Sequence, residues 1–265
     1  MRWIRFSVEG KTAYGILEGE RIIEVSGDPF NGYEQTTQTH ALHAVKIELP
    51  LIPRTFYCAG LNYVSHVSGM AAAGVTKPNI PQKPDIGFRG NGGLVAHDEP
   101  VIIPSNATSS IQYEGELVVV IGKKVKHLSV ENALSCVLGY TIGNDVSERT
   151  WQKSDRTNWR AKNCDTFNPM GPWIETNVDL DAIQTIIRLN GAEKTRFKTN
   201  DMLFSIATFI SAMTRYMTLY PGDVIWMGTD GVPPDLKAGD VVEIEITGIG
   251  TLRNTFQAEA PFTVD

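Results

Sequence analysis

The chain has few cysteines and no long apolar run. Its three cysteines, Cys58, Cys136 and Cys164, are widely spaced and form no Cys-x-x-Cys pair, which argues against a disulfide framework and a cysteine-based zinc site. No segment is long and apolar enough to cross a bilayer, and the first residues lack the apolar stretch of a signal peptide. We therefore predict a cytoplasmic protein with reduced thiols and no membrane partner.

The chain also lacks a basic cluster. Its net charge is −6 at pH 7, and its lysines and arginines form no run. Nucleic acids and anionic membranes attract basic surfaces, so neither is expected as the main partner. The glycines after Arg89 are not followed by the Gly-Lys-Ser/Thr of a phosphate-binding loop. A small molecule remains as the expected ligand.

What is present is an ordinary globular composition. The 265 residues, 42% of them hydrophobic, are enough for one large domain and a small one. Residues 1 to 50 predict a small N-terminal β-rich domain, with strands at 3–8, 12–17 and 21–25 and a loop at 28–45. Pro50 and Pro53 mark the boundary to a larger domain at 51–265.

The larger domain mixes strands with a few helices, which predicts an α+β, β-rich fold. Alternation and apolar runs favour strands at 55–59, 117–121, 223–227, 241–247 and 250–256. Helices are predicted at 63–73, from Ser129 to about Gly139, and at 202–217 with Asp201 as the N-cap. Residues 68–82, rich in Ala, Gly and Pro, are predicted to form a mobile lid.

The most informative feature is a pair of glutamates, Glu114 and Glu116, at the start of the apolar run 117–121. Residues i and i+2 of a strand point to the same face, so the two carboxyl groups lie side by side. The apolar run indicates burial on both faces, and a buried carboxylate pair needs either a proton or a cation. The second Glu-x-Glu, Glu243 and Glu245, alternates with apolar residues and is typical of a solvated strand face.

A third carboxylate, Asp145, follows in Gly143-Asn144-Asp145-Val146-Ser147. The set has no His or Cys nearby in sequence, and oxygen-only ligands favour Mg²⁺ or Mn²⁺ over zinc. Calcium also fits such a set. We therefore predict that Glu114, Glu116 and Asp145 bind one divalent ion, with a solvated strand face as the alternative.

A series of sequence blocks carries a resemblance to a known family. The blocks are Gly60-Leu61-Asn62-Tyr63-Val64-Ser65-His66, Tyr113-Glu114-Gly115-Glu116-Leu117, Gly139-Tyr140-Thr141-Ile142-Gly143-Asn144-Asp145-Val146-Ser147, Trp151-Gln152, Lys162-Asn163-Cys164-Asp165-Thr166-Phe167, Pro169-Met170-Gly171-Pro172-Trp173 and Gly250-Thr251-Leu252-Arg253-Asn254. In order and spacing they resemble the fumarylacetoacetate hydrolase (FAH) family. Residues 1 to 50 resemble the small N-terminal domain of one branch of that family.

The resemblance implies an FAH-like mixed β-sandwich or rolled sheet, usually in a homodimer, with one Mg²⁺ or Mn²⁺ per active site. The family's metal ligands fall on Glu114, Glu116 and Asp145. Its substrates are small 2-oxo acids and their enols, such as acylpyruvates, oxaloacetate or oxo-dienedioates. A 2-oxo carboxylate can chelate the ion, which stabilises the negative charge of an enolate.

The resemblance also implies roles for single residues. Lys162 matches an active-site lysine, and Gln152 and Thr229 match substrate-binding residues. Tyr63 is expected to contact the substrate with them. A solvated lysine, a surface amide and a turn hydroxyl are the structural alternatives for Lys162, Gln152 and Thr229. Arg89 stands where the family has a Phe-x-Lys-Pro segment, and it either binds a distal carboxylate of the substrate or is a surface charge.

His66 is the candidate proton-transfer group, because it occupies the family's histidine position and titrates near neutrality. An ordinary surface or core histidine is the alternative. Many family members carry a glutamate three residues later that orients the ring, whereas this chain has Gly69. A histidine without that partner is a poorer base for activating water. Asp230 in Gly228-Thr229-Asp230-Gly231 could substitute for the missing acid.

Three classes of function follow. Metal-stabilised enolate chemistry without an activated water, namely isomerisation, tautomerisation or decarboxylation, is favoured. Hydrolysis of a carbon–carbon bond in an acylpyruvate comes second, because a metal ion can itself polarise a water molecule. A non-catalytic protein that binds a metal and a small acid comes third. Phosphoryl transfer is less favoured still, because the chain has no phosphate cradle.

Overall fold

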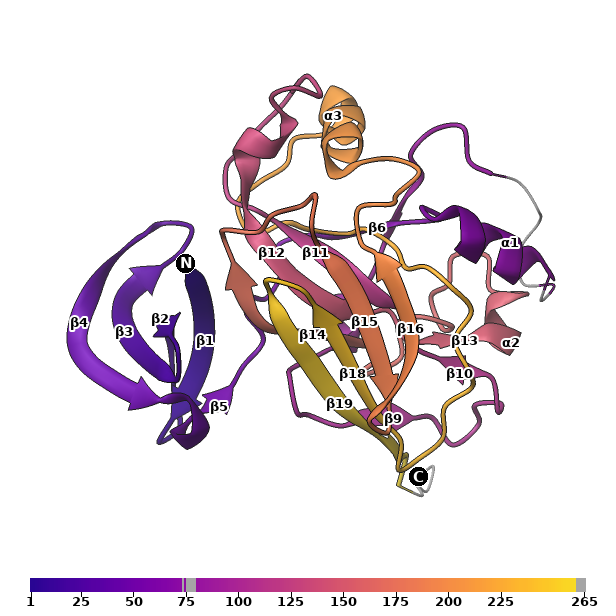
Figure 1. The fold of residues 1–265 in the computed structure, drawn as a ribbon, viewed down its shortest axis with the longest axis horizontal. Helices are drawn as coiled ribbons and strands as arrows, with labels where there is room; N and C mark the ends of the chain where they lie inside the picture. The colour runs from indigo at the N-terminus through magenta and orange to yellow at the C-terminus, as the bar shows by residue number, and fades with distance from the viewer. Residues whose placement is uncertain (73, 75–79, 261–265) are drawn as a thin grey trace, which may run out of the picture.

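The computed structural model describes residues 1–72, 74 and 80–260, and strands dominate it (Figure 1). Its N-terminal part consists of β1 (Arg2–Val8), β2 (Lys11–Glu18), β3 (Arg21–Asp28), β4 (Gly32–Ala41), a 3₁₀ turn (Leu42–Ala44) and β5 (Lys46–Ile47). The first three are the predicted strands. The domain boundary predicted between residues 50 and 51 falls in the segment between β5 and β6 (Phe56–Ala59), and it stays a prediction.

The loop predicted at residues 28–45 is wrong over most of its length, because β4 occupies residues 32 to 41. β4 pairs with β3 from Asp28↔Gly32 to Arg21↔Ala41, with one irregularity between. Most of its side chains are exposed on both faces. A strand held mainly by backbone pairing at a sheet edge needs no apolar alternation, so the sequence carried no signal for it.

The N-terminal strands continue into the large sheet through β14 (Asn168–Glu175), where Arg2 lies opposite Glu175. The order along this sheet is β4-β3-β2-β1-β14-β12-β11-β17-β6-β7, and β5 and β8 pair with β1 and β14 at its sides. The strands not yet placed are β7 (Ile86–Phe88), β8 (Leu94–Val95), β11 (Gly115–Ile121), β12 (Val137–Asn144) and β17 (Val224–Trp226).

A five-stranded sheet, in the order β16-β15-β18-β19-β9, packs against the large one (Figure 1). Its strands are β9 (Val101–Ile103), β15 (Gln184–Leu189), β16 (Ala192–Lys198), β18 (Val241–Ile246) and β19 (Gly250–Ala258), and β10 (Ile111–Gln112) pairs separately with β13 (Ser147–Glu148). Leu117 of β11 shares one buried cluster with Ile244, while Val118 belongs to another with Trp226. β11 is therefore buried on both faces, as predicted, and the β-rich mixed sandwich is confirmed.

The helices are α1 (Val64–Ala72), α2 (Arg149–Gln152) and α3 (Ile206–Tyr216), with 3₁₀ turns at Asn91–Gly93 and Ala133–Cys136. The helix predicted from Ser129 to about Gly139 is wrong except for the 3₁₀ turn Ala133–Cys136, because residues 129–132 form no helix and β12 begins at Val137 and pairs with β11. Pairing with a buried neighbour overrides a weak helix signal. α3 begins later than predicted, because Ser205 rather than Asp201 accepts the capping hydrogen bond from a backbone N–H.

The lid predicted at residues 68–82 falls partly on residues that the structure does not describe. Residues 68–72 belong to α1, and residues 73 and 75–79 lie outside the described part of the chain. Among the described helices, none has the length and apolar character needed to cross a membrane.

Candidate active site

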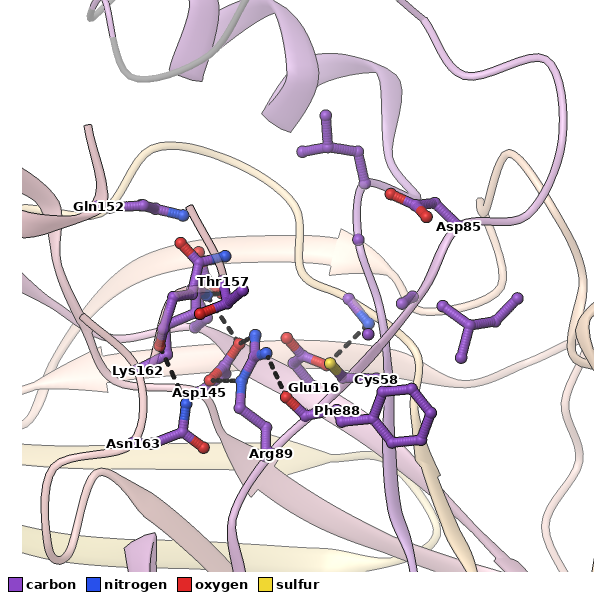
Figure 2. Close-up of a pocket in the computed structure, with 18 of the residues that line it drawn as sticks. Cys58, Asp85, Phe88, Arg89, Glu116, Asp145, Gln152, Thr157, Lys162 and Asn163 are labelled. Atoms are coloured by element: carbon purple, nitrogen blue, oxygen red, sulfur yellow. Dashed lines mark hydrogen bonds and ion pairs between the residues drawn. The ribbon is translucent and has the colours of Figure 1, made fainter. Parts of the chain in front are cut away.

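A cavity of about 710 Å³ collects most of the predicted site residues (Figure 2). Its wall is built from the end of β6, from α1, from residues 85–90 and 152–163, and from the loop at 228–229. The lining includes every predicted site residue except Tyr63: His66, Arg89, Glu114, Glu116, Asp145, Gln152, Lys162 and Thr229. Residues far apart in the sequence therefore meet at one place.

The pairing of β11 with β12 brings the three carboxylates together. Glu114 directly precedes β11, Glu116 lies on it, and Asp145 directly follows β12. Gly115 pairs with Asn144, and the Asp145 N–H donates to the Glu114 carbonyl at 2.9 Å. One oxygen from each of the three carboxylates lies within 4.8 Å of the others, and all three residues are buried. The solvated-face alternative is therefore wrong for Glu114 and Glu116, whereas Glu243 and Glu245 do lie on a partly exposed strand face.

Two of the carboxylates have cationic partners. Lys162 Nζ lies 2.6 Å from Glu114 Oε2 and 2.7 Å from Asp145 Oδ2. Arg149 Nη2 donates to Glu114 Oε1 at 2.6 Å, and Arg89 binds Asp145 through Nε and Nη2 at 3.1 and 2.8 Å. Burial alone would raise the pKa of Glu114, but Lys162 and Arg149 outweigh it and hold that pKa well below its usual range.

Among the described residues, no cationic side chain contacts Glu116. Burial, together with the neighbouring charges of Asp145 and Glu114, raises its pKa well above the usual value. Its Oε2 accepts a hydrogen bond from the Gly228 N–H at 2.8 Å. Glu116 is therefore the carboxylate that needs either a proton or a bound cation, the two possibilities that the sequence left open. A hard divalent cation fits the trio, because clustered carboxylate oxygens are the ligands that such an ion prefers and the ion would supply the positive charge that Glu116 lacks.

His66, on the first turn of α1, points its ring toward the carboxylates. Its Nε2 lies 3.6 Å from Glu114 Oε1, and its Nδ1 lies 2.7 Å from the carbonyl oxygen of Gly231. Burial lowers the pKa of His66, even though Glu114 acts in the opposite direction. The neutral ring is therefore favoured near neutral pH.

Asp230 does not contact the His66 ring as a substitute acid. Its carboxylate accepts hydrogen bonds from the Ser65 hydroxyl and from the His66 backbone N–H, and so ties the start of α1 to the loop at 228–231. At Gly69, a Cβ atom would overlap Cγ2 of Val232. Val232 therefore occupies the space that the first atom of a side chain at position 69 would need.

The remaining predicted residues divide between cavity and core. Gln152 and Thr229 line the cavity, and Gln152 Oε1 accepts a hydrogen bond from Arg149 Nη1 at 2.9 Å. Tyr63 is buried away from the cavity, and its hydroxyl donates to the carbonyl of Thr199. Its one polar group is already bonded inside the core, and the substrate contact predicted for Tyr63 stays a prediction.

Sequence reasoning missed Arg149 and Asn168. Arg149 is buried and joins Glu114, Gln152 and Gln112 through three nitrogen atoms. Asn168 Nδ2 donates to Asp145 Oδ1 at 3.3 Å. Arg149 stands four residues after Asp145 and three before Gln152, and this spacing was the one available hint. An arginine is seldom buried without partners, and its partners become visible only in the fold.

The fold and the cavity define a class: β-rich sandwich proteins with a carboxylate trio able to hold a divalent cation. Residues 55–257 match the family model described as fumarylacetoacetate (FAA) hydrolase C-terminal, and residues 1–50 match the model described as Rv2993c-like, N-terminal. The chain belongs to the fumarylacetoacetate hydrolase family, in its branch with this N-terminal domain.

Similar proteins of this family differ in the reaction that their names state. The chain is 34% identical to a 2,4-didehydro-3-deoxy-L-rhamnonate hydrolase of Sphingomonas, over 96% of this chain and 95% of that protein. It is 35% identical to the oxaloacetate tautomerase YisK of Bacillus subtilis, over 81% of this chain and 74% of that protein. The crystal structure of a 2-hydroxyhepta-2,4-diene-1,7-dioate isomerase from Mycobacterium marinum superimposes with a TM-score of 0.87 at 34% identity, covering 98% of this chain and 100% of that one.

Proposed function

We propose that the protein is an enzyme that uses Mg²⁺ or Mn²⁺ to interconvert enol and keto forms of a small 2-oxo acid. The observation that carries this proposal is the meeting of Glu114, Glu116 and Asp145 within 4.8 Å in a cavity that also holds Lys162 and His66. A tautomerase and an isomerase among the similar proteins support the same reaction class. Decarboxylation of a 2-oxo dicarboxylate would use the same enolate.

The three carboxylates would hold the ion, which when bound supplies Lewis-acid stabilisation of negative charge on the substrate oxygens. Lys162 adds a buried positive charge beside that position, because its Nζ contacts both Glu114 and Asp145. His66 moves the proton at Nε2, the nitrogen that faces the carboxylates. Gln152 and Thr229 orient the substrate from the cavity wall.

Tautomerisation is favoured over hydrolysis by the partner of His66. Among the described residues, the ring Nδ1 atom contacts the carbonyl oxygen of Gly231 and no carboxylate, so no acid on that side raises the basicity of Nε2. A neutral histidine of lowered pKa can pass a proton between carbon and solvent but is a weak base for activating water. Carbon–carbon hydrolysis of an acylpyruvate remains the second candidate, which the similarity to a hydrolase favours.

The test is a substrate screen with Mg²⁺ or Mn²⁺ and an EDTA-treated control. Oxaloacetate, acylpyruvates and 2-hydroxy-dienedioates are followed by the ultraviolet enol band, and products are identified by NMR. We expect enol loss without cleavage, abolished by EDTA. Cleavage products would instead support the hydrolase, and inactivity on every compound would support the third candidate, a protein that only binds a metal and a small acid.

Two further expectations accompany this function. The family resemblance suggests a homodimer, and a cytoplasmic location stays a prediction. Light scattering after size exclusion tests the first expectation, and fractionation of the source cells tests the second. Twice the mass of one chain in solution would support the dimer.

A further inference from the structure

The cations that line the cavity differ in what they already bind. Lys162 contacts Glu114 and Asp145, and Arg89 holds Asp145 with two nitrogen atoms, so neither guanidinium nor ammonium is left for the far end of a substrate. Arg156 also lines the cavity, and its side chain is exposed. Within residues 1–72, 74 and 80–260 it makes no hydrogen bond or ion pair. Arg156 is therefore available to an anion.

The segment that carries Arg156 is anchored. The neighbouring Asp155 accepts hydrogen bonds through Oδ2 from the backbone N–H groups of Arg160 and Ala161, at 2.8 and 2.9 Å. The Asp155 carboxylate thus stabilises the turn through backbone hydrogen bonds, and it forms no ion pair with Arg156. The same turn continues into Lys162, which contacts Glu114 and Asp145, so one anchored segment carries both Arg156 and Lys162.

The cavity wall also contains exposed apolar side chains. Phe88 is 57% exposed and Trp159 is 68% exposed, and both line the cavity. Figure 2 shows Gln152 and Thr157 on the side of Lys162, with Phe88 and Asp85 on the other side. Asp85 and Arg156 both line the cavity, and an anionic group of a ligand would be repelled by Asp85 and attracted by Arg156.

We propose that Arg156 determines specificity by binding the second carboxylate of a 2-oxo dicarboxylic acid. This inference rests on the proposed function, because it requires the 2-oxo carboxylate end to lie at Glu114, Glu116 and Asp145. The guanidinium offers two parallel N–H donors to a carboxylate, a geometry that a lysine cannot supply. Arg156 takes the distal-carboxylate role that the sequence suggested for Arg89, whose guanidinium is bound to Asp145.

The experiment compares matched acids that differ only in a distal carboxylate or methyl group. The pairs are oxaloacetate with 2-oxobutyrate and 2-oxoglutarate with 2-oxovalerate. Turnover is measured as deuterium exchange at C3 by NMR, and binding is measured by calorimetry in Mg²⁺. The variants are Arg156→Gln, Arg156→Lys and the control Lys153→Gln, which removes one exposed positive charge from the same segment.

We expect Arg156→Gln to weaken the dicarboxylates by about 10- to 100-fold, the value of one charge-assisted contact, and to leave the monocarboxylates unchanged. Arg156→Lys should keep part of the preference, and Lys153→Gln all of it. Equal losses on both members of a pair, or the same loss in Lys153→Gln, would overturn the assignment. If the wild type turned over no 2-oxo acid, the proposed function would fail, and a dicarboxylate preference in calorimetry that Arg156→Gln removes would still support the subsite.

Discussion

The Nδ1 atom of His66 lies 2.7 Å from the carbonyl oxygen of Gly231. A carbonyl oxygen can only accept, so Nδ1 carries the proton and donates it. In the neutral ring, Nε2 then has a free lone pair, and this atom faces Glu114 at the cavity. The backbone of one loop therefore fixes which nitrogen of the histidine can exchange a proton with a ligand.

Replacing His66 by glutamine should lower kcat by about 10²- to 10⁴-fold, the usual contribution of one acid–base group. Glutamine keeps a polar side chain but cannot shuttle a proton. Calorimetry should show that the variant still binds Mn²⁺ and 2-oxo acids, because the proposed metal ligands are the three clustered carboxylates and His66 is not one of them. Unchanged turnover would show that the proton moves by another route.

Introducing glutamate at position 69 should destabilise the protein, because its Cβ atom would overlap Val232. Val232 is 52% exposed and can shift, so the cost should lie near the low end of the about 1–3 kcal/mol of an overpacked core. The double variant Gly69→Glu with Val232→Ala should recover most of that loss in urea unfolding. If the missing acid limits water activation, the double variant should also gain hydrolysis of an acylpyruvate, with Val232→Ala alone as the control. No gain in a folded double variant would count against this explanation of the favoured reaction.

The sequence predicted much of this site because the relevant residues sit at strand ends. Glu114 and Glu116 precede a run that is apolar at every position, and such a run indicates burial without knowledge of the neighbours. Asp145 lies near the two glutamates because of the β11–β12 register. Residue patterns alone did not predict that register, whereas the family resemblance placed Asp145 with the glutamates.

What the sequence could not give depends on contacts between distant segments. Nothing near Tyr63 indicates that Thr199 would take its hydroxyl, and nothing near Arg89 indicates that Asp145 would take its guanidinium. β4 was missed for a related reason, since a polar edge strand is specified by its partner β3. Local patterns indicate burial, whereas side-chain contacts such as Tyr63 with Thr199 and Arg89 with Asp145 become visible only in the fold.

Lys162→Met should destabilise the EDTA-treated protein by about 3 kcal/mol or more, because it removes a buried cation from Glu114 and Asp145. Added Mn²⁺ should reduce this loss, since the ion supplies positive charge to the same carboxylates. Urea unfolding with and without Mn²⁺ measures both effects. Lys194→Met, an exposed lysine on β16, is the control and should change little. An equal loss in both variants would argue against a structural role of the Lys162 charge.

Glu175 should make the junction between β1 and β14 sensitive to acid. Burial would raise its pKa, but the Asn177 N–H and the Arg2 guanidinium help to hold it below the usual value. A lowered carboxyl pKa contributes stability above the unfolded-state pKa of about 4.3, and this contribution is lost as the pH falls through the folded-state pKa. The free energies of unfolding of the wild type and Glu175→Gln should therefore differ by about 1–3 kcal/mol near pH 7 and converge as the pH falls below the folded-state pKa. A difference that did not vary with pH would contradict this assignment, and Glu193→Gln, at an exposed ion pair, is the control.

In the proposed mechanism, Glu114, Glu116 and Asp145 bind one divalent ion on which turnover depends. A calorimetric titration of Mn²⁺ into EDTA-treated wild type, Glu116→Gln and Glu243→Gln tests it most directly, with the enol assay run on the same samples. Glu243 belongs to the other Glu-x-Glu pair and lies on a partly exposed strand face, which makes it the matched control. We predict one ion per chain and metal-dependent turnover for the wild type and Glu243→Gln, and neither for Glu116→Gln. Full binding by Glu116→Gln, or full activity of that variant in EDTA, would contradict the account.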